Sequence, residues 1–206
     1  MDEYRTISGT STFEYEEKRS RFIACASFAD TEEKALAVLS RIRAENRTAR
    51  HNVYAYVLRQ GGRSRYSDDG EPAKTAGTPV LEAIGHAGVS DVIVVVTRYF
   101  GGILLGTGGL VRAYTAAASG ALARAELVTM REVVNCQVRL PYALFEQAQR
   151  LILAAGGKCE QPEFDDAVTL RWKMPAGTEG DLCGALGELS RGTAQPQVSA
   201  PEYAPF

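Results

Sequence analysis

Runs of apolar residues with the length of β-strands recur through the amino-terminal half of the chain. RFIACASF (21–28), NVYAYVLR (52–59) and DVIVVVTRY (91–99) are rich in β-branched and aromatic residues, which favours strands. The third run is almost wholly apolar, as expected of a strand that is covered on both faces. RSRYS (63–67) is a further candidate strand, because the Asp-Asp-Gly that follows it is typical of a turn.

Helical periodicity is found between these runs. Asp30 or Thr31 can cap a first helix, and Thr78 with Pro79 suits the start of a short second one. A third helix is predicted to begin at Gly109. The apolar face of the first helix consists of Ala35, Leu36, Leu39 and Ile42. The buried stripe of the third is predicted to be Leu110, Tyr114, Ala118 and Leu122.

A second unit is predicted to begin near residue 131. Its segments VVNCQVRL, ALFEQAQRLILAAG, KCEQPEF, AVTLRWKM, DLCGALGELS and AQPQVS follow in the order βαββαβ, which is that of a ferredoxin-like fold. The proline-containing tail APEYAPF is expected to fray. The sequence therefore predicts an α+β protein with one domain over residues 1–130 and a ferredoxin-like domain over residues 131–206.

Composition excludes several classes of protein. The amino end, MDEYRTISGT, lacks the apolar run of a signal peptide, and no apolar cluster approaches the roughly 20 residues that cross a bilayer. The four cysteines are widely spaced without a CxxC pair and only two histidines are present, so neither a zinc site nor a disulfide framework is predicted. We expect a soluble cytoplasmic protein that uses no membrane, metal or other cofactor. The sequence does not predict an oligomeric state.

The net charge of −2 excludes a generally basic nucleic-acid-binding protein, but one segment is strongly basic. Between residues 41 and 65 only Glu45 opposes the arginines, which are Arg41, Arg43, Arg47, Arg50, Arg59, Arg63 and Arg65. Arg47, Arg50 and Arg63 are therefore candidate contacts to phosphate. His51 is a further candidate, with an ordinary structural histidine as the alternative.

A glycine-rich segment, RYFGGILLGTGGLVRAY (98–114), joins the last apolar strand to the third helix. The backbone N–H groups of such a turn and the N-terminus of the helix can bind an anion. The segment contains neither a Walker motif nor GxGxxG, so a structural corner is the alternative. The candidate anion-binding residues of this glycine corner are Arg98, Gly101, Gly102, Gly106, Thr107, Gly108, Gly109 and Arg112.

An acidic turn, YSDDGEPAKTAGTP (66–79), carries three carboxylates close together. Such a cluster can bind Mg²⁺ or raise the pKa of one carboxyl group, whereas a turn that pairs with nearby arginines is ordinary turn chemistry. We predict that residues 66–77 and 98–109 approach each other and that the turn pairs with Arg98 or Arg112. The candidate residues of the turn are Asp68, Asp69, Gly70, Glu71, Thr75 and Gly77.

These segments resemble the YigZ/IMPACT family of cytosolic proteins. KRSRFIA (18–24), ARHN (49–52) and SDDGEPAKTAGTP (67–79) follow the family pattern. Further matches are Gly77, Val80, Leu81, Ile84, Val89, Val95, Val96, Arg98, Tyr99, Phe100, Gly101, Gly102, Leu105 and Gly106. The resemblance extends over essentially the whole chain. It implies a first domain like the second domain of small-subunit ribosomal protein five, followed by a ferredoxin-like domain like that of elongation factor G.

The chain departs from the family pattern at two positions. Many relatives have a cysteine two residues after the histidine, where this chain has Val53, so no His/Cys nucleophile pair is expected. Lys74 stands where a glycine is usual. Eukaryotic members that act in translational control carry an extra amino-terminal recruitment domain, which this chain starts too late to contain. Their inhibition of a kinase is therefore not expected here.

Three functions fit these observations. The first, which we favour, is a binding protein of the translation machinery with a role in translational regulation. It would contact RNA or a ribosome-associated partner through the basic segment, Tyr54, Tyr56 and the glycine corner. The second is an enzyme for a phosphorylated metabolite or nucleotide, with Asp68, Asp69 or Glu71 as metal ligands, although no catalytic pair is evident. The third is a protein–protein adaptor whose motifs only build the fold.

Overall fold

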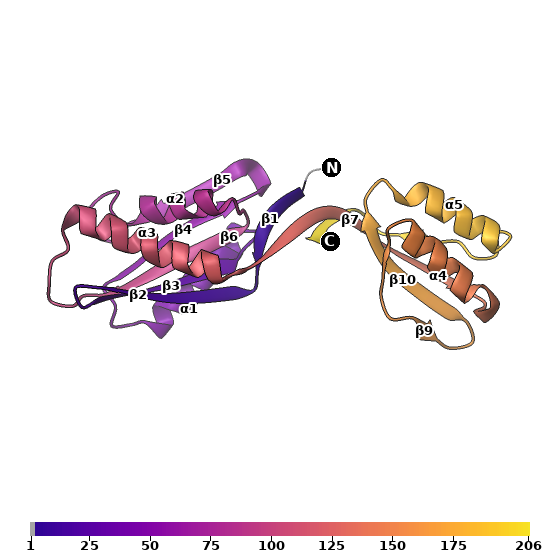
Figure 1. Cartoon of the computed structure of the whole chain (residues 1–206), viewed down its shortest axis with the longest axis horizontal. Coiled ribbons are helices and arrows are strands. Elements are labelled where there is room, and N and C mark those ends of the chain that lie inside the picture. Colours follow the sequence, from indigo (N-terminus) through magenta and orange to yellow (C-terminus); the bar gives the residue numbers. More distant parts are fainter. Residues whose placement is uncertain (1–2) are drawn as a thin grey trace. The chain divides into compact units, whose positions relative to one another are not determined.

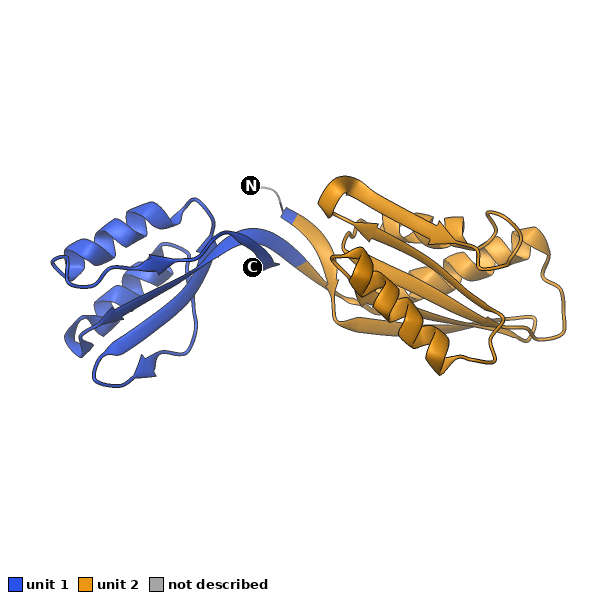
Figure 2. Ribbon diagram, turned by 180° about the vertical axis from the view of Figure 1, so that it is seen from behind, with its two compact units in different colours: residues 1–3, 129–206 blue, residues 4–128 orange. Residues whose placement is uncertain are grey.

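A five-stranded antiparallel sheet forms the frame of residues 4–128, the larger of two units of the chain (Figures 1 and 2). The structure is a computed structural model and describes residues 3–206. The strand order of this sheet is β2-β3-β6-β4-β5. The strands are β2 (Thr10–Glu17), β3 (Ser20–Phe28), β4 (His51–Leu58), β5 (Arg63–Ser67) and β6 (Val92–Tyr99).

Helices cover both faces of this sheet. α1 (Glu32–Glu45) packs on one face, and α2 (Gly77–Ala87) and α3 (Gly106–Arg124) pack on the other (Figure 1). The predicted stripe of α3 is confirmed, and in α1 Ala35, Leu39 and Ile42 are buried as predicted. The prediction was wrong for Leu36, which is 41% exposed. No helix within residues 3–206 combines the length and the apolar character needed to cross a membrane.

The central strand β6 is buried on both sides, as its unbroken apolar sequence predicted. Val92, Val94 and Val96 belong to the core beneath α2 and α3, whereas Ile93 and Val95 belong to the core beneath α1. Strand β6 therefore carries its last residues, from Arg98 onward, to one end of a doubly covered sheet. The glycine corner begins there.

The smaller unit contains residues 129–206 together with Glu3. Its strands and helices are β7 (Glu126–Leu140), α4 (Phe145–Ala154), β8 (Lys158–Cys159), β9 (Glu163–Phe164), β10 (Val168–Pro175), α5 (Glu179–Leu189), β11 (Gln197–Val198) and β12 (Glu202–Pro205). β10 pairs with β7 along one edge and with β8 and β9 along its other edge. β11 pairs with β7. This βαββαβ arrangement is the predicted ferredoxin-like fold.

Three strands were not predicted from the sequence. The polar first residues form two of them, β1 (Glu3–Ser8) and β2. β1 pairs with β7. The tail that was expected to fray forms β12, which pairs with β7 from Glu202↔Val133 to Pro205↔Met130. The prolines of this tail are tolerated because β12 is a short terminal strand, where a missing N–H donor costs little.

The starts of three elements also differ from the predictions. α3 begins at Gly106 rather than Gly109, and β7 begins at Glu126, ahead of the predicted strand. α2 begins at Gly77, so Thr78 is not its cap. The Thr78 hydroxyl is buried and has no hydrogen-bond partner among residues 3–206. The first N–H groups of α2 are instead bound by a side chain of the acidic turn.

Candidate functional site

Asp68 of the acidic turn caps α2 from a distance. Its Oδ1 accepts hydrogen bonds from the backbone N–H groups of Ala76, at 3.1 Å, and Gly77, at 2.8 Å, and its Oδ2 accepts one from Lys74 N at 3.0 Å. A carboxylate is well suited to this position because the N-terminus of a helix carries partial positive charge. The Asp68 carboxylate is thus occupied in building the turn.

Asp69 ties the acidic turn to β4 and α1. Its carboxylate accepts from Asn52 N at 2.7 Å and from Arg43 Nη2 at 2.8 Å. His51 Nδ1 donates to the Asp69 carbonyl oxygen at 2.8 Å. His51 is therefore a half-buried residue that holds the turn, which is the structural alternative for this histidine.

Glu71 forms a buried ionic network with β6 and α3. Its Oε1 accepts from Arg98 Nη1 at 2.7 Å and from the Tyr114 hydroxyl at 2.8 Å. The side chains of Arg98 and Glu71 are only 8% and 4% exposed. Burial, followed by the charge of Glu71, raises the pKa of Tyr114 well above its usual value, so this hydroxyl stays protonated and donates.

The predicted approach of the acidic turn to the glycine corner is confirmed by this ion pair. The partner of the turn is Arg98 rather than Arg112. Of the other turn candidates, Thr75 donates through Oγ1 to Pro72 O at 2.7 Å. Gly77 is required for packing, because a Cβ there would lie 2.8 Å from the backbone carbon of Ser67.

The glycine corner combines one packing position with an open helix start. A Cβ on Gly101 would lie 2.1 Å from the backbone carbon of Arg19, so only glycine fits. Gly102 and Gly106 have φ values of +86° and +72° with no neighbour within 4 Å of a Cβ. α3 then begins without a side-chain cap or an acidic residue in its first turn. The N–H groups of its exposed first residues Gly106, Thr107 and Gly108 precede the first intrahelical hydrogen bond and are therefore candidate donors to a ligand.

The basic segment 41–65 does not form one surface. Register places His51 opposite Arg98, so the loop that carries Arg47 and Arg50 lies at the glycine-corner end of the sheet. Arg63 pairs with Leu58 at the other end. Several of the remaining arginines have carboxylate partners, namely Arg41 with Glu45, Arg43 with Asp69 and Arg65 with Glu32. The predicted set of phosphate contacts is thus divided between the two ends.

Two further cations lie at the glycine-corner end. Lys18 and Arg19 form the turn between β2 and β3, against which Gly101 packs. Both are exposed, as are Arg47 and Arg50, and none of the four forms an ion pair with a carboxylate of residues 3–206. We call Lys18, Arg19, Arg47 and Arg50 the cationic end. Sequence reasoning did not select Lys18 and Arg19, although the basic KRSR at 18–21 was a usable signal.

The aromatic residues proposed for base stacking lie in the core. Tyr54 and Tyr56 are 9% and 3% exposed and stack on each other beneath α1, at 6.4 Å between ring centroids. Both faces of β4 are covered, so neither ring can reach a ligand. Phe100, at the start of the glycine corner, is an exposed aromatic residue.

Cysteine and metal chemistry give little support to a catalytic site. Cys25 and Cys136 are buried free thiols, and burial raises the pKa of Cys136 to about 11. Cys136 is therefore a protonated core residue. Within the described range, 3–206, no group of three or more His, Cys, Asp or Glu side chains is placed to hold a metal ion.

Lys74, which replaces the usual glycine of the acidic turn, has φ +63°. A residue with a side chain is strained by about 1–2 kcal/mol in this left-handed region, and glycine is free of that strain. Glycine, however, loses more conformational entropy on folding, which offsets part of the gain. We expect Lys74→Gly to raise the free energy of unfolding by up to about 1 kcal/mol in urea denaturation. A decrease would instead mean that the Lys74 side chain itself stabilises the turn.

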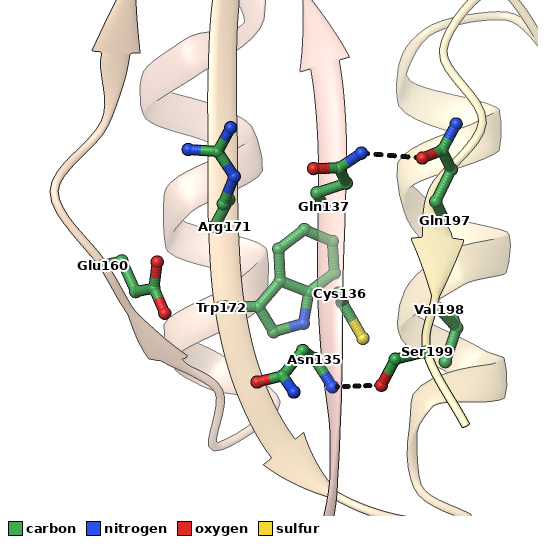
Figure 3. A pocket seen from close by; sticks show the side chains of 9 residues that line it. All are labelled: Asn135, Cys136, Gln137, Glu160, Arg171, Trp172, Gln197, Val198 and Ser199. Atoms are coloured by element: carbon green, nitrogen blue, oxygen red, sulfur yellow. Dashed lines mark hydrogen bonds between the residues drawn. The ribbon is translucent and has the colours of Figure 1, made fainter. Parts of the chain in front are cut away.

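The smaller unit has a polar pocket that sequence reasoning missed. A shallow pocket of about 360 Å³ lies across β10, β7 and β11, where Gln137 Nε2 donates to Gln197 Oε1 at 2.6 Å (Figure 3). The alternation of polar and buried residues in NCQVR (135–139) was the signal for this open sheet face. Its two arginines are paired, Arg139 with Asp166 and Arg171 with Glu163. The face is thus largely neutral, in contrast to the cationic end.

Comparison with known proteins gives matches over both units. Residues 18–122 match the Impact N-terminal domain, and residues 138–193 match a domain of unknown function (DUF1949). The chain is 43% identical to "IMPACT family member in pol 5'region" of Thermus thermophilus, over 85% of this chain and 96% of that protein. It is 36% identical to "IMPACT family member YigZ" of Escherichia coli, over 95% of this chain and 97% of that protein.

A solved structure, described as "Crystal structure of an hypothetical protein", is also similar. It has 34% sequence identity and a TM-score of 0.65 over 98% of both chains. The predicted α+β fold is confirmed. Its first domain is like the second domain of small-subunit ribosomal protein five, and its second domain is ferredoxin-like.

Proposed function

We propose that this chain, which belongs to the IMPACT family, binds RNA of the translation machinery through the cationic end of its larger unit. The observation that carries the proposal is the group of four exposed cations without carboxylate partners among residues 3–206. The open N-terminus of α3 adds further donors for phosphate. The resemblance to a family with members in translational control supports placing this RNA in the translation machinery.

The conformation of Lys18 and Arg19 supports a role for their charges. Their φ values are +47° and +65°, and they form a two-residue hairpin turn between Glu17 and Ser20. Asn-Gly is the preferred sequence for such a turn, whereas other residues are strained there. A turn that only closed the hairpin would be more stable with Asn-Gly. The presence of two cations at these positions therefore favours a function for them.

The contacts of the acidic turn favour binding over catalysis. Asp68, Asp69 and Glu71 all accept hydrogen bonds from fixed groups of the turn and its neighbours. A general base needs a lone pair that faces a substrate, and a metal ligand needs one that faces the ion. Because these carboxylates are already bonded to groups of the fold, they support the enzyme hypothesis less than the binding hypothesis. The cations come from separate segments, which suits a polyanion better than a small metabolite.

Replacing Lys18 and Arg19 by the preferred turn sequence separates binding from stability. We expect Lys18→Asn with Arg19→Gly to weaken binding of single-stranded RNA while the melting temperature stays the same or rises. Each lost phosphate contact should flatten the log–log dependence of affinity on salt by about 0.7, or about 1.4 for the pair. Fluorescence anisotropy of a labelled oligonucleotide across a salt series measures both affinity and slope.

A charge-matched variant at the other end of the sheet serves as the control. Lys34 lies near Phe28, and Arg63 lies beside Leu58, so Lys34→Gln with Arg63→Gln removes the same charge far from the cationic end. This control should retain the slope of the unchanged protein, whereas Arg47→Gln with Arg50→Gln should lower it. Equal losses in the control and the cationic-end variants would contradict the assigned surface. Absence of RNA binding at low salt would remove the proposal.

A further inference from the structure

The first residue after β6 presents an aromatic ring to solvent. Phe100 is 53% exposed, and Ile103 and Leu104 of the same loop are 43% and 82% exposed. Large apolar side chains gathered in one exposed loop mark an interaction surface more often than a structural need. This apolar loop begins the glycine corner, next to the cationic end.

Phe100 rests against a fixed cation. The Arg98 guanidinium lies 5.6 Å from the centroid of the Phe100 ring and 5.5 Å from that of Phe22. Arg98 Nη1 donates a hydrogen bond to Glu71 Oε1 at 2.7 Å, and this ion pair fixes the position of the guanidinium. Among residues 3–206, Arg98 Nε has no hydrogen-bond partner although it is buried. The cation–π contacts with the two rings are therefore expected to offset part of its desolvation. The Phe100 ring is thus in contact with Arg98 and also exposed to solvent, where a ligand can reach it.

The backbone next to Phe100 is also fixed. Gly101 N donates to Ser20 Oγ at 3.1 Å, and Gly101 lies directly against the backbone of Arg19. These contacts bring the cationic turn of Lys18 and Arg19 next to the aromatic ring. An aromatic platform beside cations matches the repeating unit of a single-stranded nucleic acid, in which a base and a phosphate alternate.

We propose that Phe100 stacks on an unpaired base of the bound RNA while Lys18 and Arg19 contact the adjoining phosphates. This inference rests on the proposed function and narrows its ligand to single-stranded RNA, because bases within a duplex are already stacked on both faces. Ile103 and Leu104 add apolar contact to the same or the next base. Arg98 acts as a positioning residue beneath the ring.

Three oligonucleotides of equal length test the stacking step: an unstructured oligouridine, the same backbone without bases, and a duplex. We expect the oligouridine to bind more tightly than the abasic strand by roughly 5- to 150-fold for one stacked base. Phe100→Ala should remove most of this difference and leave the salt slope unchanged. Phe100→Trp should preserve it, with fluorescence quenched by the oligouridine and not by the abasic strand. The natural Trp172 is buried in the smaller unit and provides a constant background.

The outcomes separate this inference from the proposed function. Equal affinity of the unchanged protein for the oligouridine and the abasic strand, with a steep salt slope, would overturn stacking and leave phosphate binding intact. Tighter binding of the duplex would likewise overturn it. No binding of any oligonucleotide at low salt would remove both proposals and would leave the apolar loop as a surface for a protein partner.

Discussion

Replacing Arg98 by methionine is expected to lower the free energy of unfolding by about 3–5 kcal/mol. The change removes the cation from a buried ion pair and leaves the Tyr114 hydroxyl as the one side-chain donor to the Glu71 carboxylate among residues 3–206. An unpaired charge in a position only 4% exposed is strongly unfavourable. Because whole domains are stable by about 5–15 kcal/mol, the loss should be evident in urea denaturation followed by circular dichroism.

An exposed ion pair of the same turn provides the control. Arg43 pairs with Asp69 at 2.8 Å with its own side chain 47% exposed, so Arg43→Met should cost no more than about 1 kcal/mol. Adding Glu71→Gln to Arg98→Met should restore part of the lost stability, because the buried charge is then absent. Equal effects of Arg43→Met and Arg98→Met would show that the network is not buried as described.

Gly101→Ala is expected to be the most disruptive substitution of the glycine corner. The added Cβ would lie 2.1 Å from the backbone carbon and 2.2 Å from the carbonyl oxygen of Arg19. Backbone atoms cannot rotate away as a side chain can, so the β2–β3 turn or the start of the corner has to move. Overpacking of this kind costs about 1–3 kcal/mol and occasionally more. We expect at least about 3 kcal/mol here, measured as a lower midpoint of urea unfolding.

Two other glycines show whether the clash is the cause. Gly102→Ala meets no neighbour within 4 Å but has φ +86°, so only backbone strain of about 1–2 kcal/mol is expected. Gly85→Ala, within α2, meets no neighbour and should stabilise the helix by about 0.5–1 kcal/mol. Similar losses for Gly101→Ala and Gly102→Ala would attribute the effect to strain rather than to contact with Arg19.

Elements with a local signal were predicted well from the sequence. β3, β4 and β6 lie within a residue of the predicted runs, because apolar, β-branched and aromatic runs favour strands regardless of their partners. β5 has the predicted bounds as well, and its signal was the Asp-Asp-Gly turn that follows it. The contact between the acidic turn and Arg98 was also predicted, since a central strand delivers its end to a defined edge of the sheet.

Features that depend on distant segments were missed. β1 and β12 are strands because β7 is available to pair with them, and their own sequences are polar or contain proline. The cap of α2 comes from Asp68, which lies well before the helix, while the local candidate Thr78 is unused. Tyr54 and Tyr56 suggested a stacking surface, but both faces of β4 are covered.

The basic segment shows the same limit for the candidate site. Seven arginines are close in sequence, yet the strand β4 and the hairpin after it carry Arg63 away from Arg47 and Arg50. Lys18 and Arg19 come from another part of the chain and join the same end of the sheet through Gly101. Charge density along a sequence therefore did not identify the surface that these residues share in the fold.

Chemical-shift mapping of the isotope-labelled chain with single-stranded RNA identifies the residues that contact the RNA. We expect the backbone amide signals that move on titration to lie within residues 18–21, 46–51 and 98–112, with smaller movements at higher salt. Movements confined to the polar face of the smaller unit, residues 135–139 and 169–173, or to residues 30–34 and 60–63 at the other end of the larger sheet, would contradict this expectation.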